Sequence, residues 1–109
     1  MPRKMREPLD TLIHSPVRLA VLSILISVER ADFKYLKEAI HVTDGNLSTH
    51  LSKLEEAGLI SVTKGFRGKK PHTDYAITEE GRRRFAEYVE NLERMIHFGD
   101  IQKTKGGAP

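Results

Sequence analysis

The residues of this chain best suited to recognition chemistry lie between Thr43 and Lys53, on one face of a predicted helix. Leu47, Leu51 and Leu54 recur at spacings of four and three residues, so they form one apolar stripe that faces the core. The opposite face then carries short hydroxyl and amide side chains, which can approach and bond base edges in the major groove of DNA. We expect these residues to contact DNA: Asp44, Gly45, Asn46, Ser48, Thr49, His50, Ser52 and Lys53.

The side chains of this face differ in what they can bond. Asn pairs bidentately with adenine, whereas Ser and Thr bond to bases or to phosphates. A merely solvated helix face is the alternative, but such faces usually prefer Lys, Glu and Arg, as Glu55 and Glu56 begin to show. Ser48 and His50 flank the face and could touch phosphate. The residues expected nearest to bases are Asn46, Thr49, Ser52 and Lys53.

A basic segment that follows the helix is the second candidate surface. Between Ala57 and Thr73 the sequence has no Asp or Glu, while Lys and Arg accumulate. Such a patch neutralises phosphates and releases counterions. Charged hairpin tips can serve solubility alone, but they usually mix both signs. We predict contact with phosphates or the minor groove through Lys64, Arg67, Gly68, Lys69, Lys70 and His72.

Other basic residues carry weaker signals. The arginines at 82–84 could reach phosphate, but acidic residues stand near them at helical spacing, so we favour salt bridges and plain solvation. Arg3, Lys4 and Arg6 could lie in a minor groove, and an unstructured arm explains them at least as well.

The sequence offers no catalytic or metal-binding constellation. It has no Cys, which excludes a disulfide scaffold, a thiolate metal site and a Cys nucleophile. Its five His residues stand at no HxxxH or HxH spacing, and no pair of carboxylates stands out for acid–base work. A P-loop motif is absent, and the GxxG at 65–68 is flanked by strands rather than by the helices of KH modules. We expect no enzymatic activity, no cofactor and no metal.

Composition indicates one globular domain. The chain has 109 residues, of which 39% are apolar, and a net charge of +3. The mild basic excess permits a polyanionic partner without proving one. The longest apolar stretch, residues 19–28, falls well short of the ~20 residues that a membrane span needs. No signal-peptide core follows the N-terminus. We expect a cytoplasmic, nucleoid-associated protein with no membrane partner.

Caps and periodicity predict the helices that position these surfaces. Ser15 and Pro16 begin a helix that is apolar nearly all round and therefore buried on several sides. A short helix over 33–40 and the helix over about 44–57 follow. Gly58 suits the left-handed residue that ends a helix.

After Gly58 the apolar period changes from 3.6 to 2 residues. Two alternating runs around residues 65–71 predict a β-hairpin with a long loop, and Pro71 should mark the edge of that loop. Thr78 then caps a last helix over 79–98. We expect a basic arm over 1–8, one domain over 9–98 and a disordered tail over 99–109.

The last helix carries a second apolar pattern. Phe85, Val89, Leu92 and Ile96 step by four, three and four residues, which is typical of a heptad-like seam. Tyr88 and Met95 broaden this seam.

The stretch from His14 to Tyr88 resembles the small winged-helix transcriptional regulators of bacteria and archaea, near the MarR and ArsR groups. Residues 43–60 are similar to their recognition helix and its exit into the wing, and residues 75–82 to the close of the wing. The resemblance implies a homodimer on a near-palindromic operator, paired through its terminal helices. The implied interface residues are Leu12, Leu22, Ile26, Phe85, Tyr88, Val89, Leu92, Met95 and Ile96.

Two departures from those groups limit what the resemblance implies. Metal sensors of the ArsR type use a Cys pair, which this chain lacks. Larger MarR proteins frame a ligand pocket with longer flanking helices, for which this chain has little room. The effector, if there is one, stays unknown.

We therefore predict a mainly α, α+β winged helix-turn-helix with terminal dimerisation helices. Its predicted function is sequence-specific binding of double-stranded DNA, as a homodimeric transcriptional regulator. The alternative is a winged-helix module for protein–protein contact inside a larger assembly. In that case protein would cover the polar helix face, and the isolated chain would be a monomer.

Overall fold

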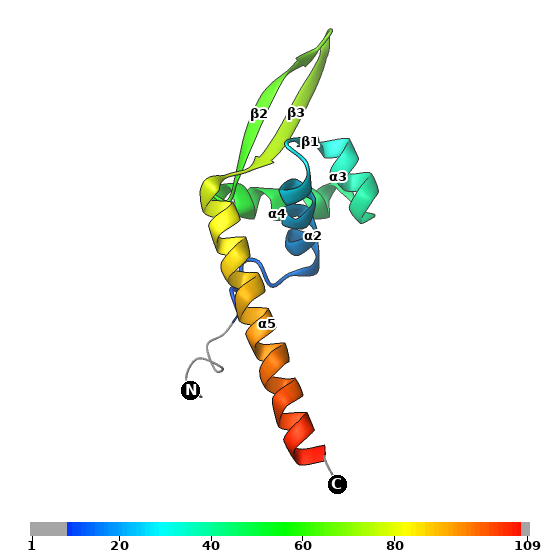
Figure 1. Cartoon of the computed structure of the whole chain (residues 1–109). Helices are drawn as coiled ribbons and strands as arrows, with labels where there is room; N and C mark the ends of the chain where they lie inside the picture. Colours follow the sequence, from blue (N-terminus) through cyan, green and yellow to red (C-terminus); the bar gives the residue numbers. More distant parts are fainter. Residues whose placement is uncertain (1–8, 108–109) are drawn as a thin grey trace.

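A hairpin projects from one end of a helical body, and a long helix leaves the body in the opposite direction (Figure 1). The structure is a computed structural model that describes the backbone of residues 9–107 and the side chains of residues 9–97. The predicted basic arm over 1–8 lies outside the described residues. The elements are α2 (Pro16–Ser27), β1 (Ala31–Asp32), α3 (Phe33–Ile40), α4 (Asp44–Glu56), β2 (Ile60–Arg67), β3 (Lys70–Ile77) and α5 (Glu79–Gly107).

Local sequence signals set where the first helices begin and end. Ser15, Asp32 and Thr43 each accept a hydrogen bond from the backbone N–H three residues on, at 3.5, 2.8 and 3.1 Å. His41 ends α3 with a φ of 64°, and Gly58 follows α4 with a φ of 79°. The left-handed His41 bends the chain sharply between α3 and α4, so these two helices form a helix-turn-helix.

The three helices α2, α3 and α4 pack around one apolar core. The stripe predicted on α4 is buried, and α2 contributes side chains from more than one of its faces, as its all-round apolar pattern predicted. The core residues of the described chain include Ile13, Val21, Leu22, Leu25, Leu36, Leu47, Leu51, Leu54, Leu59, Ile60 and Tyr88.

The hairpin of β2 and β3, which we call the wing, is longer and tighter than the sequence predicted. The strands pair from Ile60↔Ile77 out to Arg67↔Lys70, so only two residues form the turn. The predicted long loop is therefore wrong, because Gly68, with a φ of 62°, turns the chain within the ladder itself. Pro71 lies inside β3 rather than at a loop edge.

A strand that the sequence did not indicate completes the sheet. β1 pairs antiparallel with β3, which gives the order β1-β3-β2. Ala31 lies opposite Tyr75, and Asp32 lies opposite Asp74. Two residues are too short to show an alternating pattern, so only the packing against β3 reveals the strand.

The last helix is longer than predicted. α5 continues to Gly107, whereas we expected it to end near residue 98 and residues 99–109 to be disordered. The disordered tail is thus wrong for residues 99–107. From Glu79 to Gly107 the sequence has no proline, and a single glycine inside a helix costs only about 1 kcal/mol, so the polar composition did not end the helix.

A close approach of two backbones joins α5 to the rest of the molecule. Thr78 caps α5 by accepting the N–H of Gly81 at 2.9 Å, and it donates to the carbonyl of Gly58 at 2.7 Å. A Cβ at Gly81 would lie 2.1 Å from the carbonyl oxygen of Leu59. Only glycine fits there, so Gly81 sets how α5 leaves the wing.

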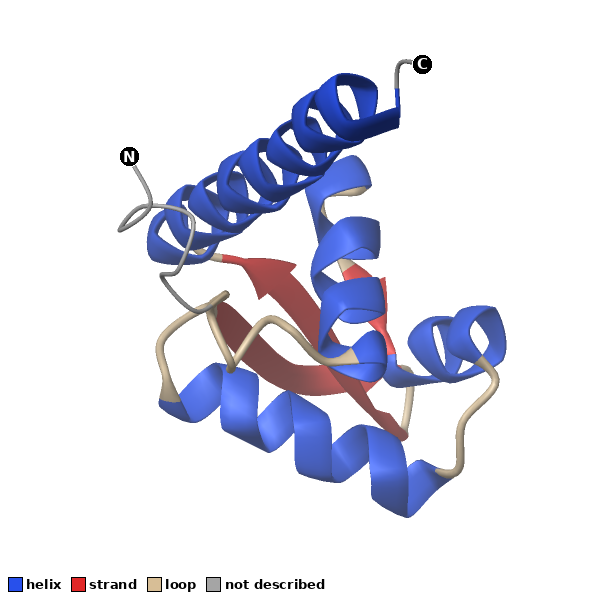
Figure 2. Ribbon diagram, turned by 90° about the horizontal axis from the view of Figure 1, so that it is seen from below, coloured by secondary structure: helices blue, strands red, loops and turns tan. Residues whose placement is uncertain are grey.

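Seen from below, α5 runs along one side of the molecule and α4 along the other, with the strands between them (Figure 2). The outer face of α4 and the long helix therefore point to different sides. Within the part of the chain that the structure describes, no helix combines the length and apolar character of a membrane span.

Candidate nucleic-acid interface

The outer face of α4 is open to solvent along its length. All of its predicted contact residues are exposed except His50, which is partly buried. The leucines on the inner face hold the helix against the core at 0–3% exposure. A helix that packs on the core through one face and exposes a polar face on the other side can bind a partner without unpacking.

Three of the contact residues predicted on α4 are engaged within the chain, and Asp44 and Thr49 are the two whose partners are close in the helix-turn-helix. Asp44 accepts an ion pair from Lys37 at 2.8 Å, which ties α3 to α4 and offsets a carboxylate that would repel phosphate. The hydroxyl of Thr49 donates to the carbonyl of Gly45 at 2.9 Å. Its methyl group stays available for an apolar contact, such as the methyl group of thymine.

His50 is held by an arginine from another helix. Its Nδ1 lies 2.8 Å from Nη1 of Arg18, which can only donate. Burial, together with the positive charges of Arg18 and Lys53, lowers the pKa of His50 below its ordinary 6.5. The ring is therefore neutral at pH 7 and accepts from Arg18, which leaves only Nε2 for DNA.

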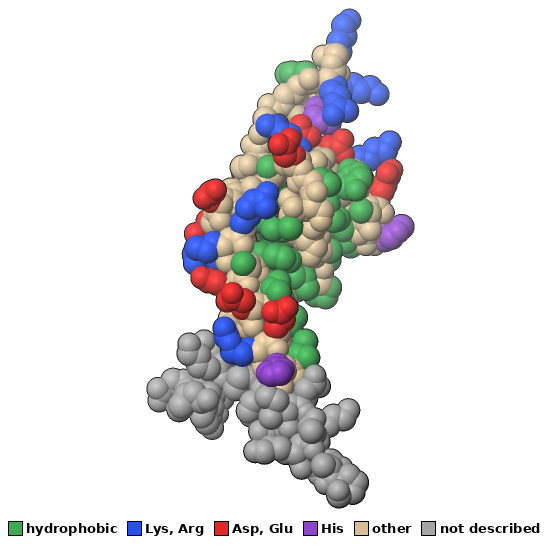
Figure 3. Space-filling view, viewed as in Figure 1, with side chains coloured by type: hydrophobic (Ala, Val, Ile, Leu, Met, Phe, Trp, Pro, Cys, Tyr) green, Lys and Arg blue, Asp and Glu red, His purple; other side chains and the backbone are tan. Residues whose placement is uncertain are grey.

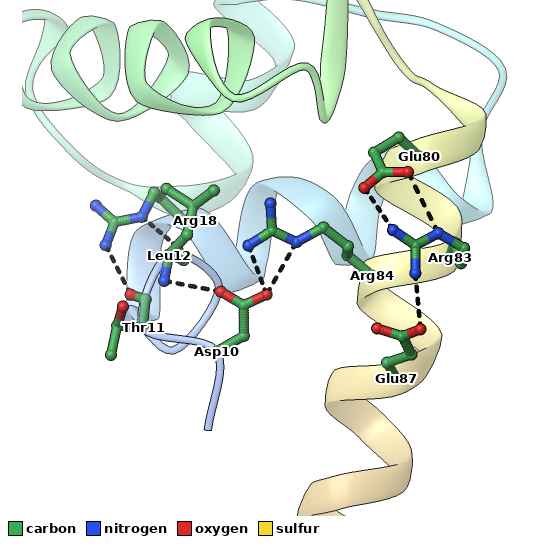
Figure 4. Close-up of polar contacts among 8 residues, drawn as sticks. All are labelled: Asp10, Thr11, Leu12, Arg18, Glu80, Arg83, Arg84 and Glu87. Carbon is green, nitrogen blue, oxygen red and sulfur yellow. Dashed lines mark hydrogen bonds and ion pairs between the residues drawn. The ribbon is translucent and has the colours of Figure 1, made fainter. Parts of the chain in front are cut away.

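Arg18 links this histidine to the segment before α2. Its guanidinium also donates to the carbonyl oxygens of Leu12 and, at 3.3 Å, of Thr11 (Figure 4). Arg18 thus holds the middle of α4 against a fixed backbone. Sequence reasoning did not select this residue, although a single arginine inside an otherwise apolar helix was a signal for it.

Asp10 connects the segment before α2 to α5 through hydrogen bonds. Its Oδ2 accepts two hydrogen bonds from Arg84, at 3.1 and 2.8 Å, and its Oδ1 accepts the backbone N–H of Leu12 at 3.0 Å (Figure 4). Polar contacts therefore run from α5 through Asp10 and Arg18 to His50 on α4.

The arginines at the start of α5 are largely committed to salt bridges. Arg83 lies 2.6 Å from Glu80 and 2.7 Å from Glu87 (Figure 4). The predicted salt bridges at helical spacing are confirmed for this residue. Because all three side chains are about half exposed, these pairs contribute little to stability.

The basic residues of the wing gather toward its tip. Lys64, Arg67, Lys69 and Lys70 are all exposed, and Figure 3 shows Lys and Arg side chains at the far end of the hairpin. His72 differs from them, because its Nε2 lies 3.0 Å from Asp74 and both side chains are three-quarters or more buried. His72 therefore lies in the outer half of the wing, where its contact with Asp74 makes it less available than the lysines.

The wing and α4 meet in one concave surface. A shallow cavity of about 160 Å³ separates them, with Ser48 and Ser52 on the helix side and Val62, Lys64 and Tyr75 on the wing side. Burial and the charge of Glu55 raise the pKa of Tyr75, so its hydroxyl stays protonated and can donate. We call the outer face of α4 together with this side of the wing the α4–wing surface.

The predicted dimer residues fall into three groups. Leu22 and Tyr88 are 0% and 3% exposed within a single chain, so they belong to its core. The prediction that these two residues contact a second chain is therefore wrong. Tyr88 also bonds His14, with 2.8 Å between its hydroxyl and Nδ1. The partly buried group is Leu12, Phe85, Val89 and Leu92, and the exposed group is Ile26, Met95 and Ile96.

Comparison with protein families gives a match over most of the chain. Residues 17–96 match the family described as a winged helix DNA-binding domain. An uncharacterized protein of Methanocaldococcus jannaschii is 40% identical over 84 residues, which cover 77% of this chain and 91% of the relative.

Solved structures share the fold. A transcriptional regulator homologue from Pyrococcus horikoshii OT3 superposes with a TM-score of 0.79 and 26% identity, over 91% of this chain and 95% of the other. A transcriptional regulator of the MarR family from Enterococcus faecalis V583 superposes with a TM-score of 0.65 and 20% identity, over 89% and 84% of the two chains. The predicted resemblance to small winged-helix regulators is thereby confirmed.

Proposed function

Because this chain belongs to the winged helix DNA-binding domain family, we propose that it is a transcriptional regulator that binds specific double-stranded DNA as a homodimer. The observation that carries the proposal is the α4–wing surface, where an exposed polar helix face adjoins an exposed basic hairpin. A base-reading element and a phosphate-binding element then act side by side.

In this proposal α4 enters the major groove. The groove is about 12 Å wide, which admits one helix, and short side chains let the helix axis come close to the bases. Asn46, Thr49, Ser52 and Lys53 stand nearest to base edges, and Ser48 adjoins the wing. A Cβ added at Gly45 would meet nothing within 4 Å, so this position is free for close approach by DNA.

The wing supplies the part of the affinity that does not depend on sequence. Lys64, Arg67, Lys69 and Lys70 displace counterions from phosphates on both sides of the adjacent minor groove. Exposed lysines and arginines suit that role, and the segment 57–73 that carries them contains no Asp or Glu.

We place the dimer contact on α5. Its heptad-like seam leaves Met95 and Ile96 at 41% and 57% exposure, beyond the part of the helix that packs on the body. Two seams that bury each other would remove this apolar surface from water. The two-fold axis would place the α4 helices about 34 Å apart, or a multiple of it, on a near-palindromic operator.

Fluorescence anisotropy across a salt series tests the DNA proposal. The probe is a labelled duplex from the region upstream of the chain's own gene, compared with a scrambled duplex. We expect preference for the first, two chains per site, and a steep decrease in affinity with salt. Equal affinity for both duplexes would contradict specific reading, and no binding to either at low salt would favour the protein–protein alternative.

Sedimentation tests the dimer independently of DNA. Ile96→Glu puts a charge into the seam and should shift the protein to a monomer. Arg94→Glu is the matched control, because residue 94 lies on the opposite side of a helix that turns by about 100° per residue. A wild-type monomer, or a dimer that both variants retain, would contradict the α5 interface.

A further inference from the structure

An aromatic side chain is exposed to solvent among the basic residues of the wing. Phe66 is 74% exposed, more than any other large apolar residue that is exposed in the described chain. It lies two residues from the turn, paired with Pro71 across the ladder. Phe66 and the exposed Pro71 opposite it thus form a small apolar cluster at the end of a projecting element.

The strand register shows which side of the wing Phe66 occupies. Residues opposite each other and two apart along a strand share a face. Phe66 and Pro71 therefore lie on the same face as Val62 and Tyr75, which border α4. Arg67 and Lys70, paired with each other, lie on the other face.

The charges around Phe66 identify the class of partner. Lys64 shares its face, Arg67 is its neighbour in the chain, and Lys69 and Lys70 stand just beyond it, all exposed. An apolar protein surface would have to desolvate these cations, whereas a polyanion with apolar sugars and bases satisfies both kinds of side chain. The complementary partner is therefore a nucleic acid.

The length of the wing places Phe66 at a minor groove. Phe66 stands six positions along the strand from Ile60, which is anchored in the core. A strand rises about 3.3 Å per residue, so Phe66 lies roughly 20 Å out from the core. With α4 in the major groove, such a projection crosses the phosphate backbone to the neighbouring minor groove, which is about 6 Å wide.

We propose that Phe66, backed by Pro71, is an apolar wedge that enters the minor groove and bends the DNA. Apolar side chains that press between base steps there partly unstack them and kink the duplex. The wedge would favour flexible steps at the flank of the operator, so it adds sequence preference at positions that α4 does not reach. This inference rests on the proposed DNA-binding function.

Three variants separate the wedge from the charges of the wing. Phe66→Ala removes the ring, Phe66→Leu keeps apolar bulk, and Lys69→Ala removes one charge and leaves the ring. Bending is measured by energy transfer between dyes at the two ends of the upstream duplex, and affinity by anisotropy across salt. Both substituted positions are exposed, so the variants should fold like the wild type, which a thermal melt checks.

We expect Phe66→Ala to abolish most of the bend and to weaken binding about 10- to 100-fold, as the loss of a buried phenylalanine contact would. Its salt dependence should not change. Phe66→Leu should retain most of both properties. Lys69→Ala should keep the bend and lower the salt slope by about one unit.

Specific results would overturn the wedge. If Phe66→Ala binds and bends DNA as the wild type does, the inference is wrong while the proposed function stands. A loss of affinity with an unchanged bend would show a contact to the backbone rather than a wedge. A wild-type protein that binds no duplex would overturn the proposed function and this inference together.

Discussion

The two halves of the α4–wing surface are built in opposite ways. On α4, three side chains of the outer face are positioned by contacts within the chain: Asp44 with Lys37, Thr49 with Gly45 and His50 with Arg18. On the wing, the basic side chains near the tip form no ion pair with a carboxylate of the described residues. The helix is preorganised, which suits reading of bases, whereas the wing holds free charge, which suits general attraction to phosphate.

Gly81→Ala should have the largest effect, because it disturbs the joint on which both halves depend. The new Cβ would meet the carbonyl oxygen of Leu59 at 2.1 Å, and neither backbone can move easily. We expect a loss of about 3 kcal/mol in the free energy of unfolding, measured by urea denaturation.

Gly45→Ala is the matched control for that variant. A Cβ there meets nothing within 4 Å, and alanine favours helix over glycine by up to about 1 kcal/mol. This variant should be at least as stable as the wild type. Equal destabilisation of both variants would show that the crowding at Gly81 is not what matters.

Asn46→Ala tests the preorganised half. We expect it to weaken binding to the preferred duplex by about 1–3 kcal/mol and to the scrambled duplex by far less, because an amide reads bases and contributes little to general attraction. Anisotropy on the two duplexes measures both losses. Similar losses on both would remove Asn46 from base reading.

Lys70→Ala tests the charged half. It should weaken binding to every sequence alike and lower the slope of log affinity against log salt by about one unit. The same salt series measures it, with Asn46→Ala as the contrast. An unchanged slope would exclude Lys70 from the DNA contact.

The smallest effect should be a pH dependence of stability from His50. Its pKa is lowered in the folded chain, so the unfolded chain binds this proton first as the pH falls. The free energy of unfolding should therefore be highest above about pH 6.5, decrease below it, and level off once the folded ring is protonated too.

Urea denaturation at several pH values, on the wild type and on His50→Gln, isolates this contribution from those of the other histidines. The glutamine variant should lose less stability between pH 7.5 and pH 5. If both proteins respond identically, the contact of His50 with Arg18 does not contribute to the pH dependence.

The elements of the α4–wing surface were predictable because the signals that form them are local in the sequence. Ser15 caps the start of α2 and Thr43 caps the start of α4, and Gly58, in the left-handed conformation, follows the end of α4. Each of these signals lies within a few residues of the hydrogen bonds that it forms. The exposed face of α4 could be predicted because three leucines at helical spacing mark the opposite, buried face. The apolar seam of α5 was equally predictable from its spacing. The spacing alone, however, does not tell whether a seam residue packs in the chain's own core or against a partner chain.

The errors concern contacts between residues far apart in the sequence. Leu22 fits an interface pattern, yet the packing of the other helices covers it completely. The tight turn of the wing depends on a ladder that stays paired to its end, and β1 exists only because β3 lies beside it.

By itself, the sequence determined the helix-turn-helix, the presence of a hairpin, the polar face of α4 and the basic character of the wing. Only the tertiary structure decided that Arg18 holds His50, that Asp10 joins α5 to the segment before α2, and that Phe66 stands on the side of the wing that faces α4. The reason is physical: caps, periodicity and charge act over one or two turns of chain. Packing and strand register depend instead on which distant segments come to lie together.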